Sequence, residues 1–215
     1  MSLTYISEIL PSLLSGAVMT IKIFFWTLVG ALPLGILVSM GLRSRFVGLR
    51  WGLNFYVWLM RGTPLLLQLM FIFYGLPDVN IVFARYPAAL LAFILNYAAY
   101  FAEIFRGGFA SINAGQYEGA RVLGLTYAQT LRRIVLPQVV KSVIPAVGNE
   151  VINLVKDSSL VYVIGLGDLL RAGNVASARD VTLVPLILVG IIYLLLTLVC
   201  TWGLRSLERH YSYYR

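Results

Sequence analysis

The sequence predicts an all-α integral membrane protein whose single domain, residues 1–215, contains five transmembrane helices. The composition is the first reason: 60% of the residues are hydrophobic, only 12% are charged, and the mean hydropathy is +0.84. A soluble domain carries about 25% charged residues. The second reason is that the apolar residues gather in runs of the length that crosses a bilayer, which is about 20 residues in a helix.

Five segments have this length: residues of about 12–42, 52–76, 88–106, 141–166 and 183–204. The first is long enough to be one tilted helix, or a short surface helix followed by a span. Prolines occur inside or at the edges of several spans, which membrane helices tolerate. They are Pro33, Pro64, Pro145 and Pro185.

Most of the 17 Lys and Arg residues lie in three places: between the first two spans, between the third and fourth, and in the tail. Because positive residues concentrate on the cytoplasmic side, we expect an external N-terminus and a cytoplasmic C-terminus in a multi-pass protein. The N-terminal segment lacks a basic region and a small-residue cleavage site, so we expect no cleaved signal peptide.

Several other classes are excluded by residue content. The net charge of +8 comes without a basic run interleaved with aromatics, so nucleic-acid binding is not expected. Cys200 and His210 are the only residues of their types, which excludes a zinc site built from Cys and His. No Ser/His/Asp arrangement or HExxH motif is present, so we expect no catalytic residues and no metal.

Polar side chains recur inside two of the spans, where an ionisable group costs at least about 2.5 kcal/mol on insertion scales. In the third span they follow i, i+4, i+7 spacing, one face of a helix: Asn96, Tyr100 and Glu103. In the fourth they follow i, i+3, i+7 spacing and are flanked by Lys156: Glu150, Asn153 and Asp157.

The second span has its own irregularity, because Gly62 and Pro64 can break the helix beside Arg61 and Thr63. Irregular backbone at membrane depth is tolerated only against protein or a water-filled cavity. The three spans together predict a hydrophilic path or substrate pocket; the alternative is polar contacts that hold helices together. The candidate pocket residues are Lys156, Asp157, Glu150, Asn153, Asn96, Tyr100, Arg61, Thr63 and Gln68.

The segment EGARVLGLTYAQTLRRIVLP, residues 118–137, matches the signature E-A-A-x3-G-x9-I-x-L-P at full spacing. This resembles the EAA motif of permease subunits of bacterial ATP-binding-cassette (ABC) importers. The matching positions are Glu118, Gly119, Ala120, Gly124, Ile134, Leu136 and Pro137, with Gly119 where the family usually has Ala. RGTPLLLQL (61–69), NYAAYFAEIFRGG (96–108) and GNEVINLVKDSSLVYVIG (148–165) are similar to the polar amino-acid permeases, the histidine/glutamine/arginine/glutamate/cystine type.

The resemblance implies a type I importer permease core in a bacterial cytoplasmic membrane, with a coupling-helix region at about 111–137. This region, Arg121 included, would dock on a dimer of cytoplasmic ATPase subunits. Gly124 would allow a turn between two short helices, and Pro137 would end the second. The alternative is a basic amphipathic helix that rests on anionic membrane lipid.

Energy must come from outside the chain. None of its three lysines follows a glycine, so the phosphate-binding motif G-x-x-x-x-G-K-[ST] is absent. The resemblance implies no cofactor in this chain, with ATP and Mg²⁺ bound by the partner ATPase. It also implies a second permease subunit, identical or a paralogue, and an extracytoplasmic substrate-binding protein.

The family pattern implies import of a polar amino acid by alternating access, from a pocket between the second, third and fourth spans. Lys156 would face the substrate carboxylate, and Asp157 or Glu150 its amine or side chain. The balance of intramembrane charges favours a neutral polar or zwitterionic amino acid. The alternative is a self-contained channel or secondary transporter, which an inverted repeat would support; the sequence has no visible repeat.

Overall fold

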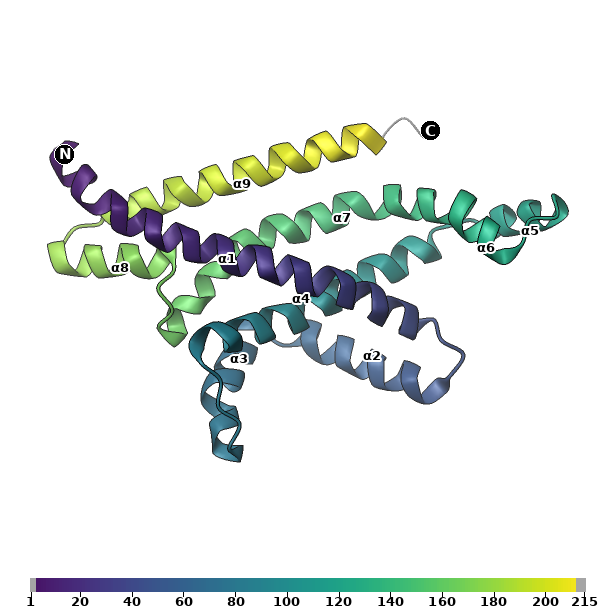
Figure 1. Ribbon diagram of the computed structural model, residues 1–215, viewed down its shortest axis with the longest axis horizontal. Helices are drawn as coiled ribbons and strands as arrows, with labels where there is room; N and C mark the ends of the chain where they lie inside the picture. The colour runs from purple at the N-terminus through teal and green to yellow at the C-terminus, as the bar shows by residue number, and fades with distance from the viewer. Residues whose placement is uncertain (1–2, 212–215) are drawn as a thin grey trace.

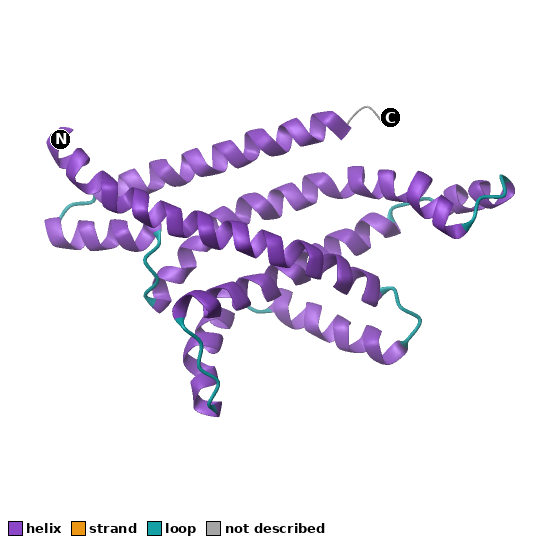
Figure 2. Ribbon diagram, in the orientation of Figure 1, coloured by secondary structure: helices purple, strands orange, loops and turns teal. Residues whose placement is uncertain are grey.

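The computed structural model describes residues 3–211, where every regular element is a helix (Figures 1 and 2). The α-helices are α1 (Leu3–Leu42), α2 (Val47–Gly62), α3 (Leu65–Met70), α4 (Arg85–Ala110), α5 (Ala114–Val122), α6 (Tyr127–Thr130), α7 (Leu136–Asp157), α8 (Leu169–Asp180) and α9 (Val184–Tyr211). Two π-helical segments, Phe71–Gly75 and Leu131–Val135, and two 3-10 segments, Leu76–Val79 and Ser158–Ile164, extend α3, α6 and α7.

Three helices of the described part are long and apolar enough to cross a membrane: α1, α4 and α9. A fourth span is formed if α2 and the helical run Leu65–Val79 count together, although these are bent by 105°. The predicted fourth span, 141–166, corresponds to α7 and the 3-10 segment after it. This helix is not among those long and apolar enough to cross a membrane, so the five-span count and the orientation stay predictions.

The first span is a single helix of 40 residues, α1, with Pro11 and Pro33 inside it. At about 1.5 Å per residue it is about 60 Å long, twice the thickness of a bilayer core. No break separates a surface part from a spanning part. Of the two forms expected for the segment, the structure therefore has the single long helix.

The second span, expected over 52–76, is broken in the middle. Thr63 has an extended backbone (φ −121°, ψ 147°), and the chain turns before α3 begins. Proline disfavours helical backbone in the residue before it and lacks the N–H that would continue the helix. Pro64 therefore ends α2. In Figure 1 the helical run Leu65–Val79, which we call the α3 arm, leaves the bundle at a steep angle to α2.

The core is centred on α4, which packs against α1, α2 and α7. Small residues let α1 and α4 approach closely, as is common between membrane helices. A Cβ built on Gly35 would lie 2.7 Å from the Cβ of Phe101, which is fully buried. Larger side chains at this crossing would push α1 away from the helix that carries the polar stripe.

The segment between α4 and α7, residues 111–135, contains the predicted turn, and we call it the connector. Gly124 has φ +73°, in the left-handed region that favours glycine, and it separates α5 from α6. The prediction that Pro137 ends the second helix is wrong, because helical backbone runs on from α6 into α7. Leu136 N–H donates to the carbonyl of Leu131, five residues back. This wider turn lets the helix continue past a proline placed at the start of α7.

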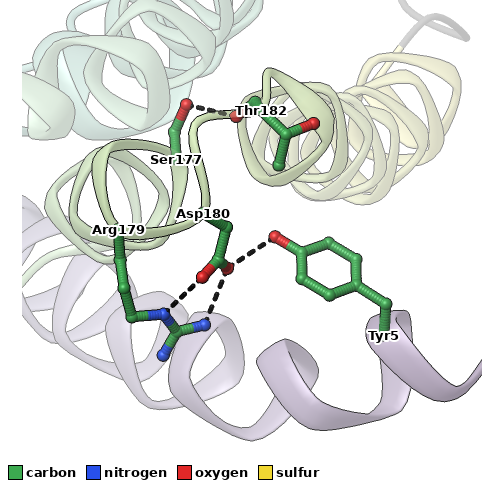
Figure 3. A network of polar contacts seen from close by, with 5 residues as sticks. All are labelled: Tyr5, Ser177, Arg179, Asp180 and Thr182. Carbon is green, nitrogen blue, oxygen red and sulfur yellow. Dashed lines mark hydrogen bonds and ion pairs between the residues drawn. The ribbon is translucent and has the colours of Figure 1, made fainter.

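At the other end of the bundle, a polar contact ties α1 to the end of α8 (Figure 3). The Tyr5 hydroxyl donates to Asp180 Oδ2 at 2.7 Å, and Arg179 donates to both oxygens of the same carboxylate, at 2.6 and 2.7 Å. The hydrogen bonds from Arg179 and Tyr5 lower the pKa of Asp180 to about 2. Ser177 donates to the carbonyl of Thr182 and closes the turn into α9.

Candidate functional site

A cavity of about 420 Å³ lies where the break in the second span meets α4 and α7. Six of the nine candidate pocket residues line it: Thr63, Asn96, Tyr100, Glu150, Asn153 and Asp157. The remaining lining residues are Pro64, Leu65, Leu66, Tyr97 and Leu160. The polar faces read from two separate spans therefore meet at one place.

Side chains from α3 and α4 stabilise the break between α2 and α3 by hydrogen bonds. Because Pro64 has no N–H, the carbonyl of Met60 loses its helical donor. It accepts instead from Gln68 Nε2 and Asn96 Nδ2, both at 2.9 Å. Asn96 also donates to Gln68 Oε1 at 3.0 Å, and Gln68 donates to Thr63 Oγ1 at 2.7 Å. Gln68 thus positions the break without itself lining the cavity.

The acidic side of the cavity comes from α7, where Glu150 and Asp157 share one helix face. The Tyr97 hydroxyl donates to Asp157 Oδ2 at 2.7 Å and fixes that carboxylate. Tyr97 is only 2% exposed, and the sequence reasoning missed it. Its spacing of three residues from Tyr100 is the signal that could have found it, since i, i+3 residues are neighbours on a helix.

The two cations expected in the pocket do not line it. Lys156 lines a different cavity of about 470 Å³, which it shares with Tyr193 and other residues of α8 and α9. Successive helix residues are about 100° apart, so Lys156 and Asp157 point to different faces of α7. Arg61 lines a third cavity, of about 640 Å³, with Glu103. Among the described residues that line the first cavity, two are acidic and none is basic.

The predicted coupling residues lie on the connector and, for Leu136 and Pro137, at the start of α7, at the far end of the molecule from α8 (Figure 1). Ala120 is buried, Ile134 and Pro137 are half-buried, and the others are exposed: Glu118, Gly119, Arg121, Gly124 and Leu136. Beside them stand three strongly exposed apolar side chains, Val122 at 88%, Leu123 at 78% and Tyr127 at 70%. We call these three the connector patch.

A Cβ built on Gly119 would meet no atom within 4 Å, so the departure from the family's usual Ala has no steric cause in this chain.

Known proteins resemble this chain over nearly its whole length. Residues 31–213 match the family described as "Binding-protein-dependent transport system inner membrane component". The arginine transport system permease protein ArtQ of Bacillus subtilis is 41% identical over 202 residues, covering 93% of this chain and 92% of ArtQ. The glutamine transport system permease protein GlnP of Escherichia coli is 36% identical over 209 residues, 93% of each chain.

The fold is also found in a solved structure, described as the crystal structure of an amino acid ABC transporter with histidines. The likeness has a TM-score of 0.91 at 32% sequence identity and covers 98% of this chain and 99% of the other. The chain therefore belongs to the family of binding-protein-dependent transport system inner membrane components and is a permease subunit of an amino-acid ABC transporter.

Proposed function

We propose that this permease imports a cationic amino acid, of the arginine type, by alternating access. The observation that carries the proposal is the cavity with two carboxylates, Glu150 and Asp157, and no lining cation. The name of the 41% identical ArtQ, an arginine transport system permease protein, agrees with it. The charge balance read from the sequence favoured a neutral or zwitterionic substrate, but it counted Arg61 and Lys156, which line other cavities.

A guanidinium or ammonium group between the two carboxylates would relieve their mutual repulsion and form charge-assisted hydrogen bonds. Tyr97 holds Asp157 ready for this contact. At membrane depth an unpaired carboxylate is costly, so both acids gain most from a cationic partner. Tyr100 and Asn153 offer further polar groups to the α-amino and α-carboxyl groups of the substrate.

The substrate carboxylate would lie at the opposite wall, near Leu65 and Leu66. These residues begin the helical run Leu65–Val79, and the first N–H groups of a helix have no intrahelical acceptor. Transporters with broken helices use such helix starts to bind anionic groups near the bilayer midplane. The broken second span would therefore have a direct role in binding.

The chain works in an assembly under this proposal. Two ATPase subunits bind ATP and Mg²⁺, a second permease subunit completes the path, and an extracytoplasmic binding protein delivers the amino acid. The connector patch (Val122, Leu123 and Tyr127) fits a docking role, because large exposed apolar side chains gather beside the EAA residues. The chain would cross the bacterial cytoplasmic membrane five times, with the N-terminus outside and the connector in the cytoplasm.

Uptake by the assembled transporter in proteoliposomes tests the proposal. Radiolabelled arginine should enter in an ATP-dependent manner and exceed glutamine at equal concentration. Glu150→Gln and Asp157→Asn should each lower arginine uptake at least tenfold, while Asp78→Asn, the same change on an exposed residue of the α3 arm, should leave it unchanged. Equal uptake of arginine and glutamine by the unaltered transporter would reject a cationic substrate.

A further inference from the structure

The polar face of α4 does not stop at the acidic cavity. Asn96 and Tyr100 line that cavity, and Glu103, one turn further along the same face, lines the neighbouring cavity of about 640 Å³. Under the predicted orientation, this second cavity lies on the cytoplasmic side of the first. A substrate that leaves along the face of α4 therefore meets Glu103 next.

Arg61 stands at the boundary between the two cavities. Its guanidinium carbon lies 5.3 Å from the centre of the Tyr100 ring, and its Nη1 lies 3.7 Å from Glu103 Oε2. Tyr100 lines the first cavity and Glu103 the second, so one cationic group contacts the border of both. An arginine side chain of the protein thus occupies the route expected for a cationic substrate.

The hold on Arg61 is loose compared with that on its neighbour. Arg106 makes two hydrogen bonds with Glu103, at 2.9 and 2.7 Å, whereas the Arg61 nitrogen is 3.7 Å from Glu103, beyond hydrogen-bond distance. A carboxylate has about four acceptor sites, and Arg106 uses two of them. Glu103 can therefore accept a further guanidinium or ammonium group if Arg61 moves.

We propose that Glu103 is a second binding station for the cationic group of the substrate, and that Arg61 occupies this station in the absence of substrate. A leaving substrate would displace Arg61 from Tyr100 and Glu103. On its return Arg61 would repel a cation that approaches from the cytoplasm and so favour net import. The inference rests on the proposed cationic substrate and adds two residues, Arg61 and Glu103, that determine its release.

Equilibrium binding of arginine and of citrulline, its neutral isostere, to the detergent-solubilised transporter tests this station. Arg61→Gln should tighten arginine binding about tenfold, because a competing and repelling charge is removed, and should leave citrulline within twofold. Arg43→Gln is the matched control: Arg43 stacks over Phe109 at 4.1 Å but lines neither cavity, so its loss should change neither ligand.

Glu103→Gln supplies a second test if Arg61→Gln does not assemble. It removes the station and leaves the cations, so arginine binding should weaken about tenfold while citrulline stays within twofold. Equal changes for arginine and citrulline in either variant would overturn the station. If the unaltered transporter binds citrulline as tightly as arginine, the proposed substrate class fails instead, so the two failures are distinguishable.

Discussion

The acidic cavity and the connector differ in where they place polar and apolar side chains: the cavity has polar side chains inside the bundle, and the connector has apolar side chains on its surface. At the cavity, polar groups lie inside an apolar bundle, and those at the helix break are satisfied by a network from three helices, centred on the carbonyl of Met60. The connector does the reverse and leaves the apolar side chains of the connector patch exposed outside the bundle. The cavity thus depends on tertiary contacts within this chain, whereas the connector, under the proposed function, would bury its apolar side chains against an ATPase subunit.

The largest effect is expected from Gln68→Leu, which disrupts the hydrogen-bond network beside the cavity. The change removes a donor to the carbonyl of Met60 and leaves Asn96 Nδ2 without one acceptor. Leaving buried polar groups unpaired costs about 1–3 kcal/mol, so the detergent-solubilised protein should unfold at a lower temperature and arginine uptake should fall. Leu67→Ala, on an exposed neighbour of α3, is the control for simple loss of a side chain. An unchanged melting temperature in Gln68→Leu would mean that the network does not hold the break.

Gly124→Val alters the turn of the connector. A β-branched residue at φ +73° is strained by about 1–2 kcal/mol, and the strain lies in the turn that orients α5 against α6. We expect ATPase assembly or ATP-coupled uptake to be lost while arginine binding to the isolated permease is kept. Co-purification with the ATPase, measured beside binding, separates the two. Normal assembly with normal uptake would contradict a coupling role for the connector.

Tyr97→Phe should give a smaller effect, confined to the cavity. The change removes the hydroxyl that donates to Asp157 Oδ2 and keeps the ring. A hydrogen bond to a charged group contributes about 1.5–3 kcal/mol, and part of it will be replaced by water. Arginine should bind several-fold more weakly, as read by isothermal titration, with ATPase assembly intact. Tyr86→Phe, on the same helix but outside the cavity, should bind arginine normally.

The smallest effect is expected from Gly119→Ala, which restores the family's usual residue. The added methyl group meets no atom, and alanine favours a helix over glycine by about 1 kcal/mol. The variant should melt at the same or a slightly higher temperature and import arginine normally. A clear loss of uptake would mean that the ATPase approaches the backbone at this glycine.

The comparison also explains what the sequence could predict. The connector was recognised because its residues are contiguous, and the turn at Gly124 follows from local backbone preference. The end of a helix at Pro137 was predicted wrongly, because the π-helical turn before it is set by how α6 joins α7. For the cavity, helical spacing correctly grouped Glu150, Asn153 and Asp157 on one face.

Spacing could not assign the partners of each face. Lys156 and Arg61 were included because they lie at suitable depths, but depth does not say which neighbouring helix a side chain meets. Lys156 faces α8 and α9, and Arg61 reaches the next turn of α4. The 105° bend between α2 and the α3 arm was also beyond the sequence, although Gly62 and Pro64 marked its position.

A structure of the assembled transporter with arginine bound tests the central claim most directly, because it locates the charged ends of the substrate. The account predicts the guanidinium beside Glu150 and Asp157, with the carboxylate toward the start of α3 at Leu65. Density for the substrate in the cavity beside Lys156, or a carboxylate facing Glu150, would contradict it.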